Sequence, residues 1–344
     1  MGGGSVAQVG FGYWGTNHAR NLNRLAGRSW RYLVDTSAQQ RERARSLYPH
    51  LRVTDSLDEV LGDDDVEAVV LATPAASHAE LTRRILDAGR HVLVEKPLAL
   101  ATADALDLTE RAERAGLVLM VGHTFEFVPA IRMMREYLVN NEVGEPLYLH
   151  AQRLNLGRIQ RDINAFWSIG PHDVSIANYL LGAAPEWVSA RGARYLNDDV
   201  EDVMFVTAGY PGGILAHMHV SWLDPTKTRR TTVVGSKRML VYDDLDAEAK
   251  LRVFDKGAER LEPDAYGAWQ YRLRDGAMHA PALPMVEPLA AELEHFLDCV
   301  RAGRPSIVDG WSGVRVVAAL EAVDESLRAD GARVPVRMPA PAVA

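Results

Sequence analysis

The chain has 344 residues, of which 47% are hydrophobic and 24% charged, and its formal net charge is -8. A length above about 300 residues exceeds what one hydrophobic core normally supports, so two globular domains are expected. The acidic balance, with no run of Lys and Arg, argues against nucleic acid or an anionic membrane surface as a partner.

The chain also lacks the sequence features of a secreted or membrane-bound protein. No apolar run approaches the ~18 residues of a membrane span, and the first residues have neither the basic nor the apolar segment of a signal peptide. The single cysteine, Cys299, excludes an internal disulfide and is expected to be a small buried residue of a helix. We expect a cytoplasmic protein.

Residues 6 to 121 alternate short apolar runs with helical patterns. Ser56 and Thr102 stand where the N-caps of two of these helices are expected. This alternation is typical of an α/β fold, a doubly wound parallel sheet of the Rossmann type with right-handed crossovers, which we assign to residues 1–122. The predicted strands are 6–9, 32–34, 68–72, 91–94 and 117–121.

The segment Gly10-Phe11-Gly12-Tyr13-Trp14-Gly15 follows the first predicted strand and opens a helix. In a dinucleotide-binding turn, Gly10 permits the tight bend, Gly12 lets the backbone approach a pyrophosphate, and Gly15 allows close helix packing. The helix N-terminus then supplies amide donors and a favourable dipole. We therefore expect this segment to bind a dinucleotide.

An acidic residue at the end of the second predicted strand bears on the choice of cofactor. Asp35 can accept hydrogen bonds from the adenosine ribose, and its charge would repel a 2′-phosphate, so NAD is favoured over NADP. Arg41 and Arg43 follow closely and would tolerate a phosphate if the loop folded back, although an exposed helix face is the favoured explanation for both.

After Gly122 the pattern changes to helices at 129–139 and 172–181 and then to strands without helices between them. We expect an α/β domain over 123–334 with a large open, mostly antiparallel sheet, followed by a tail at 335–344. One face of this sheet needs covering by helices or by a second subunit. The predicted strands are 147–155, 202–209, 214–222, 231–234 and 239–242, and late helices are predicted at 289–300 and 313–327.

Glu95-Lys96-Pro97 comes directly after the strand predicted at 91–94. Ligands of open parallel sheets bind outside the carboxyl ends of the strands, so Lys96 is placed on the cofactor side. Beside an oxidised nicotinamide the pKa of its ammonium should fall, which suits a group that donates to a substrate hydroxyl. Taken alone, a surface lysine at a strand end would be the better explanation of this position.

Four motifs in order resemble the glucose-fructose oxidoreductase and inositol dehydrogenase family, Gfo/Idh/MocA. They are Ala72-Thr73-Pro74 with His78, Glu95-Lys96-Pro97, Gly122-His123-Thr124-Phe125-Glu126-Phe127, and Gly170-Pro171-His172-Asp173. The resemblance implies a Rossmann domain followed by a domain whose open sheet makes dimers or tetramers. It also implies that Lys96 and His172 meet at the nicotinamide, with a cis bond before Pro97. The cofactor site would then add Thr73, Pro74, His78, Glu95, Lys96 and Pro97 to the glycine turn.

The chemistry of alcohol oxidation agrees with this resemblance. A secondary alcohol loses a proton and a hydride together, so the enzyme needs a base and a donor that steadies the alkoxide. His172 is the natural base at neutral pH and Lys96 the natural donor. We therefore expect an oxidoreductase.

The segment that starts at Arg153 resembles that of family members acting on carbon 3 of nucleotide-linked or amino sugars. Arginines suit carboxylate or phosphate groups, while Asn and Glu suit hydroxyls and amines. Strand-edge polar residues that solvate the second domain are the alternative explanation. The expected substrate residues are Glu126, Arg153, Asn155, Arg158, Asn164, Trp167, Ser168, His172 and Asp173.

One position departs from the family pattern. An aspartate often stands four residues before the catalytic histidine, and this chain has Ser168 there. The spacing places that side chain on the face of His172, so the charge partner of the histidine and the favoured reaction direction are in doubt.

His217 and His219 share one face of a predicted strand, but no spaced carboxylate or cysteine completes a metal site, so no metal is expected. An NAD-dependent sugar or cyclitol dehydrogenase is the leading hypothesis. An NADPH-dependent keto-sugar reductase of the same fold and a non-catalytic dinucleotide-binding regulator are the alternatives.

Overall fold

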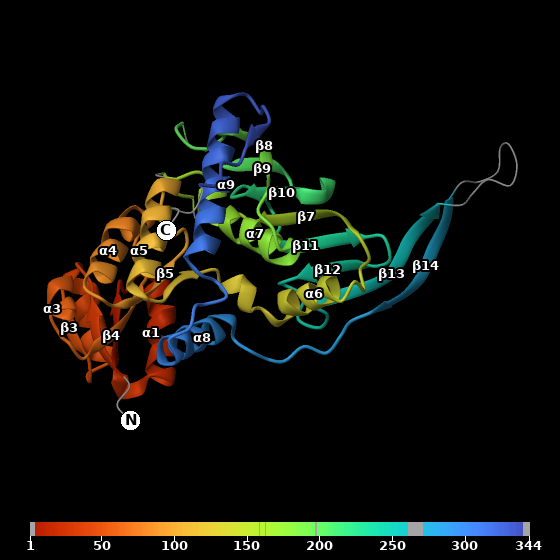
Figure 1. Ribbon diagram of the computed structural model, residues 1–344. Coiled ribbons are helices and arrows are strands. Elements are labelled where there is room, and N and C mark those ends of the chain that lie inside the picture. Colours follow the sequence, from red (N-terminus) through yellow and green to blue (C-terminus); the bar gives the residue numbers. More distant parts are fainter. Residues whose placement is uncertain (1–3, 158, 162, 197, 261–270, 340–344) are drawn as a thin grey trace, which may run out of the picture. The chain divides into compact units, whose positions relative to one another are not determined.

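The computed structural model describes residues 4–157, 159–161, 163–196, 198–260 and 271–339 (Figure 1). Its contacts divide the chain into two compact units. The first comprises the described residues of 1–127, 286–318 and from Met338 onward, and the second comprises those of 128–285 and 319–337. Residues 123–127 and 286–318, expected in the second domain, therefore belong with the first. None of the described helices is both long and apolar enough to cross a bilayer.

The first unit contains a six-stranded parallel sheet in the order β3-β2-β1-β4-β5-β6. This is the strand order of a Rossmann fold, as expected. The central strands are buried along most of their length, because helices cover both faces of such a sheet. The strands are β1 (Ser5–Val9), β2 (Trp30–Val34), β3 (Arg52–Thr54), β4 (Val66–Leu71), β5 (His91–Glu95) and β6 (Leu119–Gly122).

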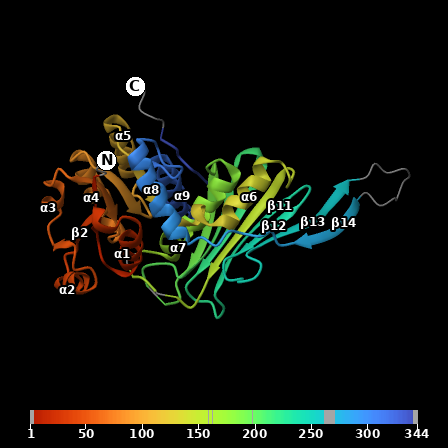
Figure 2. The same ribbon diagram turned by 90° about the horizontal axis from the view of Figure 1, so that it is seen from below.

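The crossovers between the parallel strands decide on which face of the sheet each helix of the first unit lies. The chain leaves β1 in one direction across the sheet and β4 in the other, so right-handed crossovers place their helices on opposite faces. Figure 2 shows α1 beside α8 and α4 beside α5. The helices are α1 (Tyr13–Leu25), α2 (Ala38–Leu47), α3 (Leu57–Leu61), α4 (His78–Asp87), α5 (Thr102–Ala115) and α8 (Pro288–Ala302), with 3-10 turns η1 (Gly27–Ser29), η2 (Ala75–Ser77) and η3 (Thr124–Phe127).

The second unit contains a nine-stranded sheet in the order β14-β13-β12-β11-β7-β10-β9-β8-β15. All its strand pairs are antiparallel except β7 with β10, so the expected mostly antiparallel sheet is confirmed. The strands are β7 (Pro146–Leu154), β8 (Trp187–Ala193), β9 (Val203–Gly209), β10 (Leu215–Ser221), β11 (Thr228–Gly235), β12 (Met239–Asp243), β13 (Leu251–Arg260), β14 (Tyr271–His279) and β15 (Val334–Pro335); a 3-10 turn, η4 (Pro211–Gly213), precedes β10.

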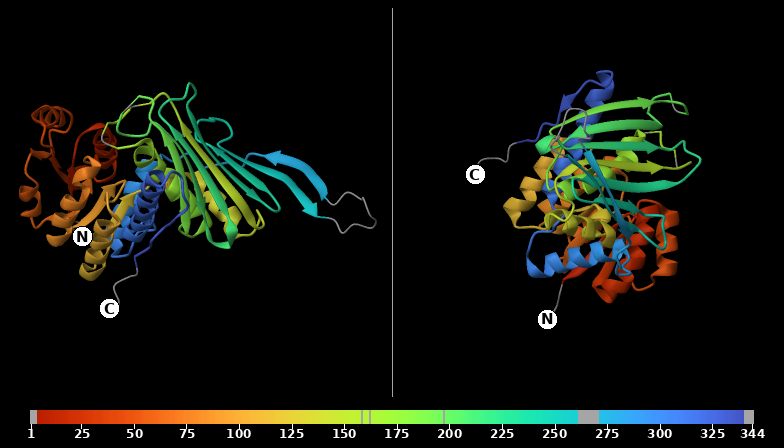
Figure 3. Two further views of the ribbon diagram at one scale, coloured as in Figure 1. Left: turned by 90° about the horizontal axis from the view of Figure 1, so that it is seen from above. Right: turned by 90° about the vertical axis from the view of Figure 1, so that its right-hand side faces the viewer.

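Helices α6 (Pro129–Val139) and α7 (Ala165–Leu181) lie on one face of this sheet (Figure 3). Ala216, Met218 and Val220 of β10 are buried on that side, whereas Leu215 and His217 point to the other. Among the described residues no helix of the second unit covers that other face. Helix α9 (Gly310–Arg328) contributes to the second unit from Ala319 onward.

Three sequence predictions are corrected by the structure. Helix α7 begins at Ala165, ahead of the predicted start at His172, so Pro171 lies inside the helix. The segment 335–344 was predicted as a tail, but Pro335 pairs with Trp187 of β8 and Val336 is buried. Thr102 is the first residue of α5, whose N-cap is Ala101, whereas Ser56 caps α3 as predicted.

Candidate active site

The three glycines of the turn after β1 meet different surroundings. Gly10 has a φ of +95°, and a Cβ there would overlap the carbonyl of Ala72. A Cβ on Gly15 would overlap the carbonyl of Gly10, so this glycine lets α1 approach the turn. A Cβ on Gly12 would meet nothing within 4 Å. Only Gly12 therefore faces open space, which is the requirement for a pyrophosphate that approaches the backbone.

The start of α1 also leaves its amide donors available. Its N-cap is Gly12, which offers no side-chain acceptor, and its first turn holds no acidic residue. Tyr13 and Trp14 in this first turn are 76% and 42% exposed. The residues present thus fit the pyrophosphate of a dinucleotide, which would use the uncapped amides and the helix dipole.

Asp35 lies at the end of β2 and faces the glycine turn. Its Oδ2 accepts a hydrogen bond from the backbone N of Phe11 (2.7 Å), and its Oδ1 accepts one from the N of Ser37 (2.8 Å). Arg41 donates to the carbonyl oxygen of Asp35 (2.9 Å) and forms an ion pair with Asp55 (3.2 Å). The Asp35 carboxylate is therefore fixed beside the turn, and the Arg41 guanidinium is held by backbone carbonyls and by Asp55.

Lys96 follows the end of β5, and the peptide bond between Lys96 and Pro97 is cis. The preceding residue, Glu95, accepts a hydrogen bond from the backbone N of Lys96 at Oε2 (3.2 Å) and from Nε2 of His18 at Oε1 (2.8 Å). Burial would raise the pKa of Glu95, but the hydrogen bond from His18 and the positive charges of His18 and Lys96 together lower it. Glu95 is thus an ionised, nearly buried partner for the Lys96 segment.

His78, the first residue of α4, joins two of the expected cofactor loops. Its Nδ1 lies 2.7 Å from the carbonyl oxygen of Pro97, and its Nε2 lies 2.8 Å from that of Thr73. Burial lowers the pKa of His78, and the two carbonyl contacts oppose that effect. The ring therefore holds the Thr73-Pro74 loop against the Lys96-Pro97 loop.

The segment after β6 adds buried polar groups to the same unit. His123 and Glu126 are 1% and 4% exposed. Burial, with a smaller effect of the Lys96 charge, lowers the pKa of His123 to about 4, so its ring is neutral at physiological pH. Thr124 donates through Oγ1 to Oε2 of Glu292 on α8 (3.0 Å). Glu126, expected to contact substrate, is thus nearly inaccessible within this unit.

In the second unit, His172 lies in the middle of α7 and is half-buried. Asp173, the next residue, forms a buried ion pair with Arg153 of β7, in which Nε and Nη2 approach Oδ1 at 3.1 and 2.9 Å. The guanidinium that the sequence analysis assigned to a substrate anion is paired with the protein's own carboxylate. This pair ties the helix that carries His172 to the sheet.

Asn164 and Trp167 anchor the start of α7. The Asn164 side chain accepts a hydrogen bond from the backbone N of Trp167 (2.9 Å) and so caps the helix. Oδ2 of Asp324 on α9 accepts from Nε1 of Trp167 (2.7 Å), and its Oδ1 accepts from Nδ2 of Asn164 (3.3 Å). These contacts explain why the helix begins before its predicted start. Substrate contact by either residue stays a prediction.

Ser168, one turn before His172, accepts a hydrogen bond at Oγ from Nε2 of Gln160 (2.7 Å). The position where relatives often carry an aspartate thus holds a neutral hydrogen-bonded pair. Asn155, which follows β7, is half-buried. Arg158 lies outside the described residues, and its predicted role is not addressed by the structure.

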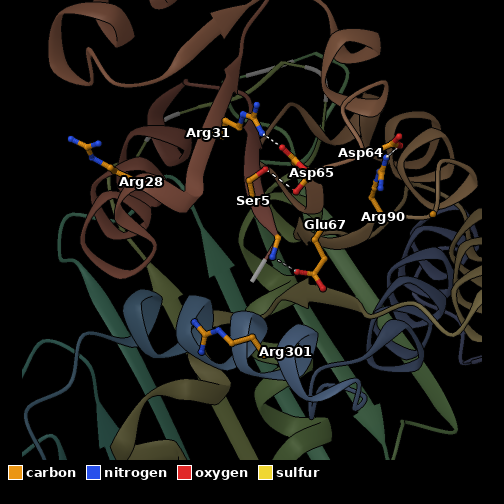
Figure 4. A pocket seen from close by; sticks show the side chains of 10 residues that line it. Ser5, Arg28, Arg31, Asp64, Asp65, Glu67, Arg90 and Arg301 are labelled. Atoms are coloured by element: carbon orange, nitrogen blue, oxygen red, sulfur yellow. Dashed lines mark hydrogen bonds and ion pairs between the residues drawn. The ribbon is translucent and has the colours of Figure 1, made fainter. Parts of the chain in front are cut away.

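A hollow of about 1010 Å³ in the first unit lies at the other end of the parallel sheet (Figure 4). It is lined near the amino ends of strands, by Ser5 of β1 and by Arg90 just before β5 among others. Its acidic residues already have partners, since Asp65 pairs with Arg31 (2.7 Å) and Asp64 with Arg90 (3.3 Å). Because Gly10, Asp35 and Lys96 all lie at the carboxyl ends, this hollow does not belong to the candidate site.

Two family models match the chain. Residues 5–123 match the oxidoreductase family with an NAD-binding Rossmann fold, GFO_IDH_MocA, and residues 131–241 match a GFO/IDH/MocA C-terminal domain. The chain belongs to the Gfo/Idh/MocA family of oxidoreductases. NAD is therefore the cofactor, as the sequence predicted. That the glycine turn and Asp35 hold it stays a prediction.

Similarity to individual family members extends over nearly the whole chain. A UDP-N-acetylglucosamine 3-dehydrogenase from Acidithiobacillus ferrooxidans is 32% identical over 90% of this chain and 93% of its own, and a solved structure of it has a TM-score of 0.79. The structure of GenD2 from gentamicin A biosynthesis, in complex with NAD, is 27% identical over 98% of this chain and 97% of that one, with a TM-score of 0.80. The scyllo-inositol 2-dehydrogenase (NAD(+)) of Bacillus subtilis is 26% identical over 88% and 87%.

Sequence reasoning missed two buried residues of this Gfo/Idh/MocA site, His18 and Glu292. Each is a polar residue within an apolar stripe: His18 stands between Gly15 and Leu22 on the buried face of α1. Glu292 stands between Leu289 and Phe296 on the buried face of α8. A titratable side chain at an apolar position of an amphipathic helix was the available signal.

Proposed function

We propose that this protein is an NAD-dependent dehydrogenase that oxidises a secondary ring hydroxyl, at carbon 3, of a nucleotide-linked sugar, an aminosugar or aminoglycoside, or a cyclitol. The observation that carries this proposal is the 32% identity, over 90% of the chain, to a UDP-N-acetylglucosamine 3-dehydrogenase. The similarity to a scyllo-inositol 2-dehydrogenase supports the wider range of ring alcohols.

Bound NAD supplies the acceptor for the hydride that leaves the alcohol carbon. In the proposed mechanism His172 takes the hydroxyl proton, and the Lys96 ammonium donates a hydrogen bond that stabilises the developing alkoxide. Glu95 keeps the Lys96 segment in place through the backbone N of Lys96. The pairing of Asp173 with Arg153 holds the helix on which His172 lies.

We extend the proposal to the substrate contacts and to assembly. Asn155, Arg158 and Ser168 are the proposed contacts for the sugar, since Glu126 is nearly inaccessible, Arg153 and Asp173 are paired with each other, and Asn164 and Trp167 hold the start of α7. A homodimer or homotetramer through the open face of the nine-stranded sheet is proposed, supported by the exposed Phe205 and Leu215 on that face. Sedimentation analysis tests this assembly.

A screen of NAD reduction against UDP-N-acetylglucosamine, aminosugars and inositols tests the function. The expected result is turnover with a ring alcohol and a product oxidised at one carbon, identified by NMR. An NADPH-dependent keto-sugar reductase would instead reduce a 3-keto sugar with NADPH and fail to use NAD. A non-catalytic regulator would bind NAD and turn over none of these compounds in either direction.

A further inference from the structure

Two arginines stand opposite each other on neighbouring strands of the nine-stranded sheet. Arg229 of β11 is the register partner of Arg153 of β7, and the two strands are antiparallel. The side chains of directly opposed residues point to the same face of a sheet. Since Arg153 reaches Asp173 of α7, both guanidinium groups lie on the face that carries α7 and His172.

The two arginines differ in how far their donors are used. Arg153 is 8% exposed, and its Nε and Nη2 both reach Asp173. Arg229 is 39% exposed, and its Nη1 donates to Oδ2 of Asp244 (3.1 Å). Nε and Nη2 of Arg229 make no hydrogen bond within the described part of the chain. Arg229 therefore presents two donor groups that a ligand can use.

Asp244, in the loop between β12 and β13, is shared by two cations. Its backbone N donates to the carbonyl oxygen of Arg229 (2.9 Å), and its Oδ1 accepts a hydrogen bond from the Tyr242 hydroxyl (2.9 Å). Nζ of Lys250 donates to the Asp244 carbonyl oxygen (2.7 Å) and lies 3.6 Å from Oδ1. Burial would raise the pKa of Asp244, but the hydrogen bonds from Tyr242 and Arg229 and the charge of Lys250 lower it.

This sharing leaves positive charge in excess. The neighbouring ion pairs, Arg230 with Asp243 and Arg252 with Asp246, match one cation to one carboxylate. Around Asp244, in contrast, one carboxylate faces a guanidinium and an ammonium, both partly exposed. A forked guanidinium beside an ammonium is suited to an oxyanion with several acceptor oxygens, such as a phosphate.

We propose that Arg229 and Lys250 bind the diphosphate of a nucleotide-linked sugar, and that this class of compound is the substrate. The inference rests on the proposed function and deepens it. The sequence analysis expected Arg153 to meet such an anion; because Asp173 occupies Arg153, the neighbouring Arg229 takes that role. The diphosphate of a nucleotide-linked sugar is attached to the same ring as carbon 3, which the base His172 serves. A neutral cyclitol has no charge to offer Arg229, and a cationic aminoglycoside would be repelled.

Calorimetric titration of the NAD-saturated protein with UDP tests the phosphate site. Arg229→Met removes the guanidinium and leaves Asp244 with its two other donors. Arg230→Met is the matched control, because Arg230 is the next residue of β11, is 43% exposed and pairs with Asp243. R229M should weaken UDP binding about 10- to 100-fold, the scale for hydrogen bonds to a charged group, and R230M less than about twofold. Arg229→Lys, which keeps the charge without the fork, should lie between them.

Kinetics separate this binding role from a role in the fold. With UDP-N-acetylglucosamine, R229M should raise KM and leave kcat near the wild-type value, because the diphosphate is bound equally in the ground state and the transition state. With N-acetylglucosamine, which has no diphosphate, R229M and wild type should have the same kcat/KM. A general disturbance of the fold would lower kcat/KM for both sugars.

UDP binding needs no oxidation step, so the absence of turnover with every ring alcohol would count against the proposed function alone. Equal UDP affinity in R229M and wild type, or no UDP binding by wild type, would overturn the phosphate site. Binding of glucuronate in place of UDP, lost in R229M, would assign the site to a carboxylate and contradict the proposal. Turnover of myo-inositol in preference to UDP-N-acetylglucosamine would overturn the substrate class. If R229M does not fold by circular dichroism, Lys250→Met replaces it and must also weaken UDP binding relative to R230M.

Discussion

Arg153 and Asp173 form an ion pair whose side chains are 8% and 2% exposed. The pair joins β7 to α7 one residue after His172, so its geometry bears on the histidine as well as on the fold. Nε and Nη2 of the guanidinium both reach the carboxylate, which is the arrangement that makes such pairs directional.

Removal of one partner should lower the free energy of unfolding, because the other charge then stays buried without an opposite charge. We expect Arg153→Met to lower the free energy of unfolding by about 3–5 kcal/mol, measured by urea denaturation. The matched control is Arg191→Met, since Arg191 pairs with Asp330 at the surface with 67% and 89% exposure. That variant should stay within about 0.5 kcal/mol of wild type. Equal losses in the two variants would contradict the structural role of the buried pair.

Asp35→Ala should reduce the preference for NAD over NADP. The carboxylate that repels a 2′-phosphate is removed, and its hydrogen bonds from Phe11 and Ser37 are lost with it. Calorimetric titration should show NAD binding more tightly than NADP to the wild type and a smaller difference in the variant. Asp58→Ala, at an exposed carboxylate paired with Arg84, is the control. Tighter binding of NADP than of NAD by the wild type would contradict the role of Asp35 in the choice of cofactor.

Lys96→Ala and His172→Ala should each lower turnover by about two to four orders of magnitude, the scale for loss of alkoxide stabilisation or proton transfer. Binding of NAD, followed by fluorescence titration, should persist in both variants. His219→Ala on the open sheet face serves as the comparison. Turnover near the wild-type rate in either catalytic variant would mean that the proton pathway is assigned wrongly.

Ser168→Asp should move the acid limb of the pH–rate profile to higher pH. A carboxylate one turn before His172 would stabilise the imidazolium, and the histidine must be neutral to act as base. Ser168→Ala separates this effect from the loss of the hydrogen bond with Gln160. If the limb stays fixed while activity is retained, then either His172 is not the titrating base or another acid already fills this role.

His123 should make the protein sensitive to mild acid. Its pKa is lowered to about 4 when folded, so between about pH 6.5 and pH 4 the unfolded chain binds a proton that the folded chain does not. Stability therefore falls as the pH falls through this window, by up to about 3 kcal/mol. His123→Gln should flatten that part of the stability profile, whereas His50→Gln, at an exposed position, should not. A wild-type profile that is level from pH 6.5 to pH 4 would refute this assignment.

The Rossmann half of the fold was predictable because its signals are local. A Cβ on Gly10 or on Gly15 would overlap a backbone carbonyl, Gly12 leaves open space, and Asp35 follows at the end of the next strand. The strand β3 escaped prediction because three residues are too short for a periodic pattern. In the second unit the hairpin of β13 and β14 escaped for another reason: most described side chains of β14 are exposed, so no alternation marks it.

The candidate site could be predicted only where its polar residues stand in short sequence motifs. Lys96 and His172 stand in such motifs, and Glu95 adjoins Lys96. The partners that set their environment come from distant segments: Glu292 lies 168 residues after Thr124, and Asp324 lies 157 residues after Trp167. No local pattern indicates which distant helix supplies a buried carboxylate. Sequence reasoning therefore indicated candidates for the reacting groups, whose roles stay predictions, and missed buried groups that pack around them.

Helix α1 carries His18, which bonds to Glu95, and the same helix begins at the glycine turn that is predicted to receive the pyrophosphate. Two events connected through one rigid element influence each other equally in both directions. If NAD binding changes the proton affinity of the His18–Glu95 pair, then proton binding to that pair changes the affinity for NAD by the same factor. In the proposed assignment of Lys96, NAD binding at the start of α1 and the charge beside this lysine are then linked through one helix.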